Sequence, residues 1–517
     1  MKRLFRNNAH SIMENIMLIL AIIAVSSMVI FHHLGQGSIW RDEAFSVELS
    51  KESLGVISHV LFTIEGNMYL YYVILHFWLN VLTLFHISWL AFPVRIPNAV
   101  GYVLASVALY ALLRTMYHTK WLAVMGVVFF LGFPFIVTYS QQARSFSLFL
   151  LFTVLSYLSL WQFLNAPRHR RVWWISYVLT STLDLYSFLN SLFYVAAQFI
   201  LVWTLWRKGD TDRTHFLQFL WALALGAGLG LPLLPPILAG GQVGWVPLPT
   251  LSEAIHLIPT YLEQSLTSPL MILIVLLGSF AIVAWIRLPS TVPSWLQITH
   301  RDEMALWFGL TWMILPPAES YVSSYIRDYH VFDPVYLLPT VEGLIILLVG
   351  GLKAIRSLQT QLTLIALSVF LVVPQWIKGQ GVSLENWRQP VLTWAHDYRA
   401  GQEIVCMDNI GGCQYTIQYY IDAYHLPIKI GNYPGHFTWN EYINLPAKGA
   451  YFAEAVNVNK LRQAGYLKPG RSIWFIFNSV PPNATVSLDH WLHQHAVMIK
   501  QLTGHNWPVS FVLYHIK

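Results

Sequence analysis

The sequence predicts a polytopic α-helical membrane protein with a small α/β domain at its C-terminus. Of its 517 residues, 56% are hydrophobic and only 11% are charged, whereas a soluble domain carries about 25% charged residues. Apolar runs of spanning length recur between residues 16 and 376, and the pattern then changes to short alternating strands and helices. This composition excludes an ordinary soluble enzyme. The net charge of +6 comes from basic residues scattered among short loops, which excludes a nucleic-acid-binding patch.

The first apolar run, 16–33, follows Lys2, Arg3 and Arg6, and no small-residue cleavage site comes after it. It therefore predicts a retained signal anchor rather than a cleaved signal peptide. Every later run is also expected to be a helix, because lipid offers no hydrogen-bond partner to an unpaired backbone group. The later runs cover 68–86, 96–113, 119–138, 146–164, 173–189, 190–206, 216–239, 268–286, 304–321, 335–352 and 361–376.

Basic loops predict the orientation, because Lys and Arg next to membrane spans are retained on the cytoplasmic side. The basic loops at 168–171, 207–213 and 353–356 are therefore expected inside. The segment 240–266 contains neither Lys nor Arg and is expected outside. Counting the membrane crossings from this segment towards the C-terminus places residues 377–517 outside, on the extracytoplasmic face of the cell membrane.

Counting the membrane crossings from these loops towards the N-terminus leaves two alternatives for the topology there. Arg114 and Lys120 belong inside by the same rule, yet two apolar runs separate them from the first outer loop. One alternative is that the run 68–86 lies in the membrane interface, where its tyrosines and histidines fit. The other is that the loop with Arg114 and Lys120 lies outside despite its basic residues. The expected number of spans is therefore about 11 to 13.

The C-terminal region is expected to form a domain over 377–517, after a transmembrane domain over 1–376. Strands are expected at 404–407, 427–430, 473–477 and 509–516, and helices at 413–423, 456–464 and 486–501. The chain has two cysteines, Cys406 and Cys413. In an extracytoplasmic domain they could form a disulfide, and the alternative is two unpaired thiols.

The first candidate site is the segment 40–45, in the outer loop 34–66. It contains the adjacent carboxylates Asp42 and Glu43 after Arg41. Adjacent carboxylates at a membrane surface can bind a cation or accept a proton from an attacking hydroxyl. The alternative is a solvated loop in which Arg41 is a local ion partner.

A second candidate group lies where the chain enters the next apolar run. Glu65 and Asn67 are followed there by three tyrosines that include Tyr72. These side chains could line a binding site, but tyrosines are also ordinary anchors at a membrane interface.

A third group contains arginines predicted to lie outside. Arg144 follows Tyr139 and Gln142 at the head of a span, and Arg95 has a similar position. Two outward arginines near a carboxylate pair could hold a phosphate bidentately, or they could extend to lipid phosphates. Trp245, in the loop without basic residues, could stack on a sugar or anchor the interface.

Four motifs in this order and spacing resemble the GT-C superfamily of polytopic glycosyltransferases. The likeness is to bacterial members related to protein O-mannosyltransferases and to the lipid A aminoarabinose transferase, over about the first 380 residues. The motifs are Asp42-Glu43, Leu70-Tyr71-Tyr72 with Leu75-His76-Phe77-Trp78, Arg95-Ile96-Pro97, and Tyr139-Ser140-Gln141-Gln142-Ala143-Arg144.

The chain also departs from the family pattern at three places. Met68-Tyr69 replaces a Pro-Pro, Gln142 stands where an acid is common, and Val335, before Tyr336, replaces an arginine.

The resemblance implies a glycosyltransferase that uses a sugar carried on a polyprenyl phosphate. It implies that Asp42 is the general base, with inversion at the anomeric carbon, and that Glu43 orients Asp42 or helps to hold a divalent metal. Arg95 and Arg144 would contact the leaving phosphate, and Glu65 and Tyr72 would line the acceptor side. The acceptor would be an extracytoplasmic glycan, lipid or protein. The competing hypotheses are a transporter or flippase of lipid-linked substrates and a degenerate transferase that serves as a scaffold.

Overall fold

The computed structural model describes residues 2–238, 246–286, 299–326, 331–408, 413–428, 457–478, 485–504 and 509–517. The chain divides into two compact units. The first, here called the helical unit, comprises Met1–His32, Glu65–Tyr71 and Asn98–Gln380. The second, here called the mixed unit, comprises His33–Ile64, Tyr72–Pro97 and Gly381–Lys517. The segment 33–64 therefore belongs to the same unit as the C-terminal region, whose start at Gly381 lies close to the expected boundary after residue 376.

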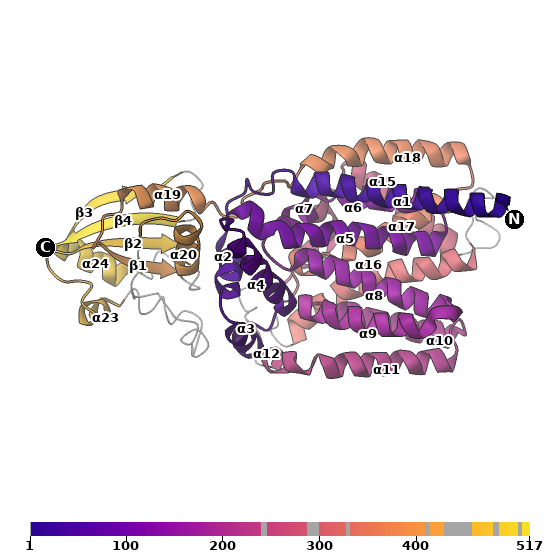
Figure 1. Cartoon of the computed structure of the whole chain (residues 1–517), viewed down its shortest axis with the longest axis horizontal. Coiled ribbons are helices and arrows are strands. Elements are labelled where there is room, and N and C mark those ends of the chain that lie inside the picture. Colours follow the sequence, from indigo (N-terminus) through magenta and orange to yellow (C-terminus); the bar gives the residue numbers. More distant parts are fainter. Residues whose placement is uncertain are drawn as a thin grey trace. The chain divides into compact units, whose positions relative to one another are not determined.

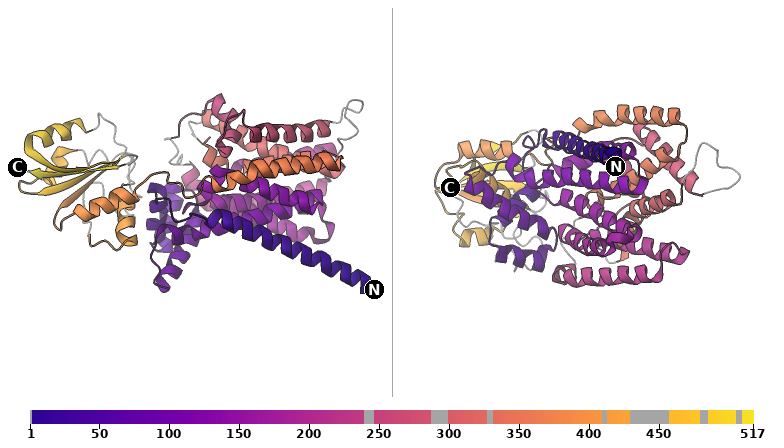
Figure 2. Two further views of the ribbon diagram at one scale, coloured as in Figure 1. Left: turned by 90° about the horizontal axis from the view of Figure 1, so that it is seen from above. Right: turned by 45° about the vertical axis from the view of Figure 1, so that its right-hand side comes forward.

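The helical unit is an array of helices that run side by side (Figures 1 and 2). Its helices are α1 (Lys2–Phe31), α5 (Ala91–Tyr117, whose first turns belong to the mixed unit), α6 (Lys120–Leu131), α7 (Pro134–Ser140), α8 (Phe146–Asn165), α9 (Arg170–Ser187), α10 (Ser191–Lys208), α11 (Arg213–Leu229), α12 (Leu234–Leu238), α13 (Leu251–Ile255), α14 (Leu257–Leu262), α15 (Pro269–Ile286), α16 (His300–Ile326), α17 (Thr340–Ala354) and α18 (Leu358–Val372), with the short 3-10 helices η2 (Pro167–His169), η3 (Leu231–Leu233), η4 (Pro334–Leu337) and η5 (Val373–Ile377).

Glycines allow the helices of this unit to approach one another closely. A Cβ atom added to Gly351 of α17 would lie 2.1 Å from the backbone oxygen of Leu277 in α15. A Cβ atom on Gly343 would lie 2.7 Å from the backbone nitrogen of Met313 in α16. Small residues at such contacts are typical of helices that pack within a membrane. We infer that α17 is held between two neighbouring backbones that any larger residue would push apart.

The outer face of the helical unit is apolar, as a lipid-facing surface requires. Large apolar side chains are exposed along α1, α9, α11, α15 and α18, among them Met17, Leu179, Trp221, Ile272 and Phe370. A soluble protein rarely exposes so extended an apolar surface. Together with the apolar helices, this surface identifies a multi-pass membrane protein.

Every apolar run expected to be a helix overlaps one or more helices of the structure, and the runs 119–138 and 216–239 are each divided into a bent pair. Of the described helices, four are long and apolar enough to cross a membrane by themselves, and two bent pairs raise this to six. One bent pair is α6 with α7, which meet at 72°, and the other is α11 with the segment Leu231–Leu238, at 52°. Prolines at the breaks, Pro134 and Pro232, explain the bends. The figure of 11 to 13 spans stays a prediction.

The mixed unit combines a four-stranded sheet with short helices. Its elements are α2 (Arg41–Ser50), α3 (Leu54–Val60), the π-helix η1 (Leu61–Glu65), α4 (Tyr69–Leu84), α19 (Arg388–Asp397), β1 (Glu403–Asp408), α20 (Cys413–Ala423), α23 (Val458–Gln463), β2 (Ser472–Asn478), α24 (Val486–His495), β3 (Ala496–Leu502) and β4 (Val509–Ile516). The strand order is β1-β2-β4-β3, with β1 and β2 parallel and the other pairs antiparallel. The helices α19 and α24 pack against the sheet (Figure 1).

The small α/β domain is confirmed, with one correction. The expected helix 486–501 ends at His495, and the chain continues as β3, an edge strand that pairs with β4. Its solvent-exposed Val497, Met498 and Ile499 gave no alternating pattern, so only the cross-strand hydrogen bonds reveal the strand. The expected strand 427–430 lies partly outside the described residues, and its described part is not a strand.

Cys406 of β1 and Cys413 of α20 form a disulfide, with their Cα atoms 6.0 Å apart. The alternative of two unpaired thiols is therefore wrong. The bond closes the connection between the strand and the helix and ties α20 to the edge of the sheet.

Candidate active site

The acidic pair lies at the start of a helix rather than in a solvated loop. Asp42 and Glu43 occupy the first turn of α2, where the helix dipole favours negative charge. Adjacent residues on an α-helix point about 100° apart, so the two carboxylates diverge. The Glu43 side chain is fully buried, whereas Asp42 is partly exposed. The pair therefore does not act as one chelating group.

Within the interior of the mixed unit, Glu43 is bound by Arg95 of α5. Arg95 Nε donates to Glu43 Oε1 at 2.8 Å and Arg95 Nη2 donates to Glu43 Oε2 at 2.7 Å, a bidentate pair. The same guanidinium donates to the backbone oxygens of Leu34, Gly37 and Ser38, at 2.8, 3.1 and 3.0 Å. These five bonds use all five N–H donors of an arginine side chain.

The expected contact between Arg95 and a phosphate stays a prediction, and the geometry of the side chain supports a different role. Its side chain is only 3% exposed and its donors are saturated within the mixed unit, so it positions the loop before α2 instead of binding a ligand. For the same reason Glu43 is a positioning residue, because Arg95 occupies both of its carboxylate oxygens. Among the described residues, no group of three or more His, Cys, Asp or Glu side chains could hold a metal ion.

A second arginine holds the loop that leads to α2. Arg388 of α19 donates to the backbone oxygens of Gly35, Gln36 and Gly37, at 2.9 to 3.1 Å. Ser38 Oγ accepts from the backbone N–H groups of Trp387 and Arg388, at 2.9 and 3.0 Å. Backbone carbonyls of one short loop thus face two cations, which fixes the position of Asp42.

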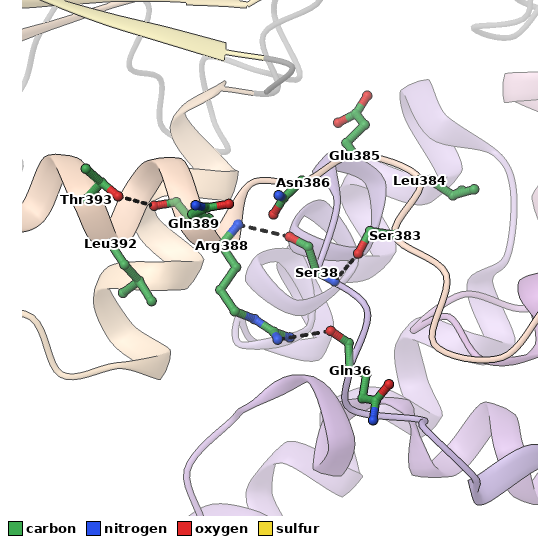
Figure 3. Close-up of a pocket in the computed structure, with 10 residues that line it drawn as sticks. All are labelled: Gln36, Ser38, Ser383, Leu384, Glu385, Asn386, Arg388, Gln389, Leu392 and Thr393. Atoms are coloured by element: carbon green, nitrogen blue, oxygen red, sulfur yellow. Dashed lines mark hydrogen bonds between the residues drawn. The ribbon is translucent and has the colours of Figure 1, made fainter. Parts of the chain in front are cut away.

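A polar cavity of about 1150 Å³ lies beside this loop (Figure 3). Its lining residues are Gln36, Ser38, Ser383, Leu384, Glu385, Asn386, Arg388, Gln389, Leu392 and Thr393. The charged groups of the lining have partners: Glu385 Oε1 accepts from Arg41 Nη2 at 3.2 Å, and Arg388 donates to backbone oxygens of the loop. What remains is a set of amides and hydroxyls suited to an uncharged, hydroxyl-bearing group.

The cavity was not predicted from the sequence. No motif singled out the segment 383–393, and Gln36 and Ser38 carried no signal of their own. The salt bridge between Arg41 and Glu385 joins positions that are far apart in the chain, and a local pattern does not reveal such a pair.

A buried cluster of charges lies at the other end of α2. Lys51 Nζ donates to Glu48 Oε2 at 2.6 Å and to Asp422 Oδ2 at 2.5 Å, and it lies 5.3 Å from the centroid of the Trp89 ring. Burial raises the pKa of Glu48 to about 7, against the attraction of Lys51. Burial lowers the pKa of Lys51, but the two carboxylates raise it more.

This cluster predicts a pH-dependent stability. Because the pKa of Glu48 rises on folding from 4.5 to about 7, its stabilisation is complete below pH 4.5 and is lost as the pH rises through 7. The difference corresponds to at most ~3 kcal/mol. We expect the melting temperature of the purified protein in detergent to fall between pH 5 and pH 8. Glu48→Gln should remove most of that fall, and the surface control Glu403→Gln should retain it. An equal fall in the Glu48→Gln variant would contradict the assignment.

Tyr72 is packed inside the mixed unit. Its side chain is 3% exposed and its ring meets Phe45 edge to face, with the ring centroids 6.3 Å apart. Phe45 in turn packs against Tyr415 of α20, at 5.1 Å. These contacts support a packing role for Tyr72 behind α2, and its expected contact with an acceptor stays a prediction.

Glu65 and Asn67 lie at a strained turn of the helical unit. Gly66 has φ +58° and Met68 has φ +64°, a left-handed conformation that is uncommon for a residue other than glycine. Asn67 Oδ1 accepts from the backbone N–H of Leu189 at 3.0 Å, which anchors the turn. Glu65, partly exposed, stays a candidate site residue.

The segment 139–144 is held by an asparagine that the sequence did not single out. Asn98 of α5 donates to the backbone oxygens of Tyr139 and Ser140, at 3.3 and 3.0 Å, and accepts from the backbone N–H of Ser147 at 2.9 Å. Gln142 is only 4% exposed, so it packs inside the turn, while Arg144 is partly exposed.

A chain of aromatic rings brings two of the predicted residues into one region of the helical unit. Tyr139 packs against Phe146 at 5.2 Å, Phe146 against Phe188 at 6.0 Å, and Phe188 against Tyr336 at 5.6 Å. Arg144 directly precedes Ser145 and Phe146 and so lies beside this chain. Trp245 lies outside the described residues.

No family model matches this sequence, and no curated protein matches it. Its structure, however, is similar to that of ArnT from Cupriavidus metallidurans, a lipid A aminoarabinose transferase. The apo ArnT structure has a TM-score of 0.63 at 12% sequence identity, covering 96% of this chain and 97% of that chain. This chain has the GT-C fold.

ArnT bound to undecaprenyl phosphate is also similar, with a TM-score of 0.56 at 12% identity and the same coverage. The apo oligosaccharyltransferase of Archaeoglobus fulgidus gives a TM-score of 0.45 at 13% identity, covering 89% of this chain and 69% of that chain. The match to ArnT over nearly the whole of both chains confirms that the GT-C fold predicted from four short motifs includes the C-terminal α/β region.

Proposed function

We propose that this protein is a membrane glycosyltransferase that transfers a sugar from a polyprenyl-phosphate carrier to an extracytoplasmic acceptor. The observation that carries the proposal is the likeness to ArnT, including the form bound to undecaprenyl phosphate, over 96% of the chain. A second observation supports the proposal: Asp42 is a partly exposed carboxylate at the N-terminus of α2. Arg95 and Arg388 hold the loop that leads to this helix.

In the proposed reaction, Asp42 accepts the proton of the acceptor hydroxyl. The hydroxyl oxygen attacks the anomeric carbon, the bond from that carbon to the phosphate oxygen breaks, and the polyprenyl phosphate leaves with the electron pair. Attack opposite the leaving group inverts the anomeric centre. Proton transfer of this kind contributes typically ~10²–10⁴-fold to a rate.

The acceptor is proposed to enter through the polar cavity of Figure 3. Its amides and hydroxyls suit a hydroxyl-bearing acceptor, and its Glu385 binds Arg41, the residue directly before Asp42. Glu65 and Asn67 are proposed to lie on the acceptor side as well. In this scheme the segment 34–66 and the C-terminal region face the extracytoplasmic space, where lipid-linked sugars are used and nucleotide sugars are absent.

Arg144 is the proposed partner of the phosphate, now that Arg95 is assigned to the loop. Replacing Arg144 by Gln should weaken the binding of undecaprenyl phosphate at least ~10-fold, the loss expected for a charge-assisted bidentate contact. Arg144→Lys should restore only part of it, because lysine keeps the charge without the planar pair of donors. Binding is measured by titrating undecaprenyl phosphate into the purified protein. Arg207→Gln is the charge-matched control, and equal losses in both variants would remove Arg144 from the site.

The function itself is tested in a strain that lacks the gene. Mass spectrometry of its envelope glycans and glycolipids should show one sugar missing from one acceptor class. Complementation with the wild-type protein should restore the sugar. Accumulation of the lipid-linked sugar on the inner face of the membrane would instead favour a transporter.

A further inference from the structure

A second cavity lies in the helical unit, between the start of α9 and the side of α11. Its volume is about 960 Å³. The lining residues are Arg168, His169, Arg170, Arg171, Val172, Trp174, Gln218, Trp221, Ala224 and Leu225. It contains none of the residues assigned to the candidate active site, and neither the proposed reaction nor the comparisons give it a role.

One end of this cavity is cationic and contains no carboxylate. Arg168, Arg170 and Arg171 lie there, at the N-terminus of the 18-residue helix α9, whose dipole adds further positive potential. The Nε atom of Arg170 is buried and has no hydrogen-bond partner within the part of the chain that the structure describes. Asp212, at the start of α11, is paired with His215 at 2.8 Å and also lies within electrostatic range of Arg170, but it does not line the cavity. The cavity therefore presents arginine donors that suit a phosphate group.

The other end of the cavity is apolar and runs along α11. Trp221, Ala224 and Leu225 lie one to two turns beyond Gln218 on the same face, which extends about 10 Å at 1.5 Å per residue. The Trp221 side chain is 72% exposed and Leu225 47%, and in a bilayer such side chains face lipid. Trp174 Nε1 donates to the backbone oxygen of Gln218 at 2.7 Å and marks the border between the two ends.

We propose that this cavity binds one anionic phospholipid. The arginines would bind the phosphate of the headgroup, and an acyl chain would lie along Trp221, Ala224 and Leu225. A cationic mouth with an apolar wall fits the two parts of a phospholipid, whereas a free phosphate would use only the mouth. Basic pockets between helices at the membrane surface bind anionic headgroups by the same electrostatic attraction.

The test uses the purified full-length protein in detergent, titrated with phosphatidylglycerol or phosphatidylcholine of identical acyl chains. Bound lipid is counted by native mass spectrometry. We expect phosphatidylglycerol to bind at least ~10-fold more tightly than phosphatidylcholine. Inorganic phosphate at the same concentration should not displace it. Equal binding of the two lipids would overturn the proposal, and displacement by inorganic phosphate would identify a free-anion site instead.

Two variants locate the site on these residues. Arg170→Gln with Arg171→Gln should reduce the binding of phosphatidylglycerol to the level of phosphatidylcholine, while the control Arg207→Gln leaves it unchanged. Ala224→Trp keeps every charge but fills the apolar end, and it should weaken both lipids. The control Leu217→Trp, on the same helix outside the cavity, should not. Loss of binding in either control, or none in the cavity variants, would place the lipid elsewhere. This outcome does not depend on the transfer reaction.

Discussion

Replacement of Asp42 by Asn is expected to lower the rate of sugar transfer ~10²–10⁴-fold, the contribution of a general base. Asparagine has the shape of aspartate but accepts no proton at neutral pH. Asp42 is partly exposed in the first turn of α2, and asparagine keeps its size and shape there. The fold, the melting temperature and the affinity for undecaprenyl phosphate should therefore stay unchanged. The measurement is transfer of labelled sugar by the purified protein, once the deletion strain has identified the acceptor.

The Asp42 variant also separates the proposed enzyme from the competing hypotheses. A transporter or flippase would keep its substrate flux in the Asp42→Asn variant, and a scaffold would have no turnover to lose. The matched control is Glu403→Gln, an acid-to-amide change in a surface ion pair with Arg471 on the sheet. Turnover unaffected by Asp42→Asn would falsify the assignment of the base, even if a sugar is missing in the deletion strain.

Replacement of Arg95 by Ala is expected to destabilise the protein by ~3–5 kcal/mol. Removing one partner of a buried ion pair leaves the other charge uncompensated. Here Glu43, fully buried, would lose both of its bonds to the guanidinium, and the backbone oxygens of Leu34 and Ser38 would lose their bonds to Arg95. Thermal or denaturant unfolding of the purified protein measures the loss.

A double variant distinguishes the ion pair from a phosphate contact. Changing Arg95 and Glu43 together to Met removes both charges, so it should be less destabilising than Arg95→Ala alone. The surface control Arg471→Ala should cost less than ~1 kcal/mol. If Arg95 instead bound the donor, Arg95→Ala would keep the stability of the protein and lose affinity for undecaprenyl phosphate. That pattern would restore the role expected from the sequence.

The helices of this protein were predictable because lipid offers the backbone no hydrogen-bond partner, so the backbone must satisfy itself. A run of apolar residues in a bilayer satisfies its backbone most simply as a helix, and every expected run, from 16–33 to 361–376, overlaps one or more helices of the structure. Two of the runs, 119–138 and 216–239, are each broken near a proline into a bent pair of helices. The strands β1, β2 and β4 were also predictable, since each is a short buried run. The strand β3 was not, because its side chains face solvent and only its bonds to β4 make it a strand.

The site was predictable in its residue types and less so in its roles. The motifs pointed to Asp42, Glu43, Arg95 and Arg144, and the GT-C fold they suggested is the fold found. Yet Glu43 and Arg95 bind each other, and Tyr72 and Gln142 are buried. The order of residues and the spacing between motifs do not show which hydrogen-bond donors of a side chain will be used by another part of the protein.

The class of this protein and the order of its parts were predictable from the amino-acid sequence: a membrane-spanning helical region with an acidic pair after its first helix, followed by an α/β region. These follow from composition and periodicity, which are local properties. The tertiary structure alone decided that Arg95 is saturated by Glu43 and the loop 34–38, that Glu385 binds Arg41, and that the two cysteines are bonded. Each of these depends on groups distant in the chain meeting in space, because a buried charge or polar group must find its partner wherever the fold supplies one.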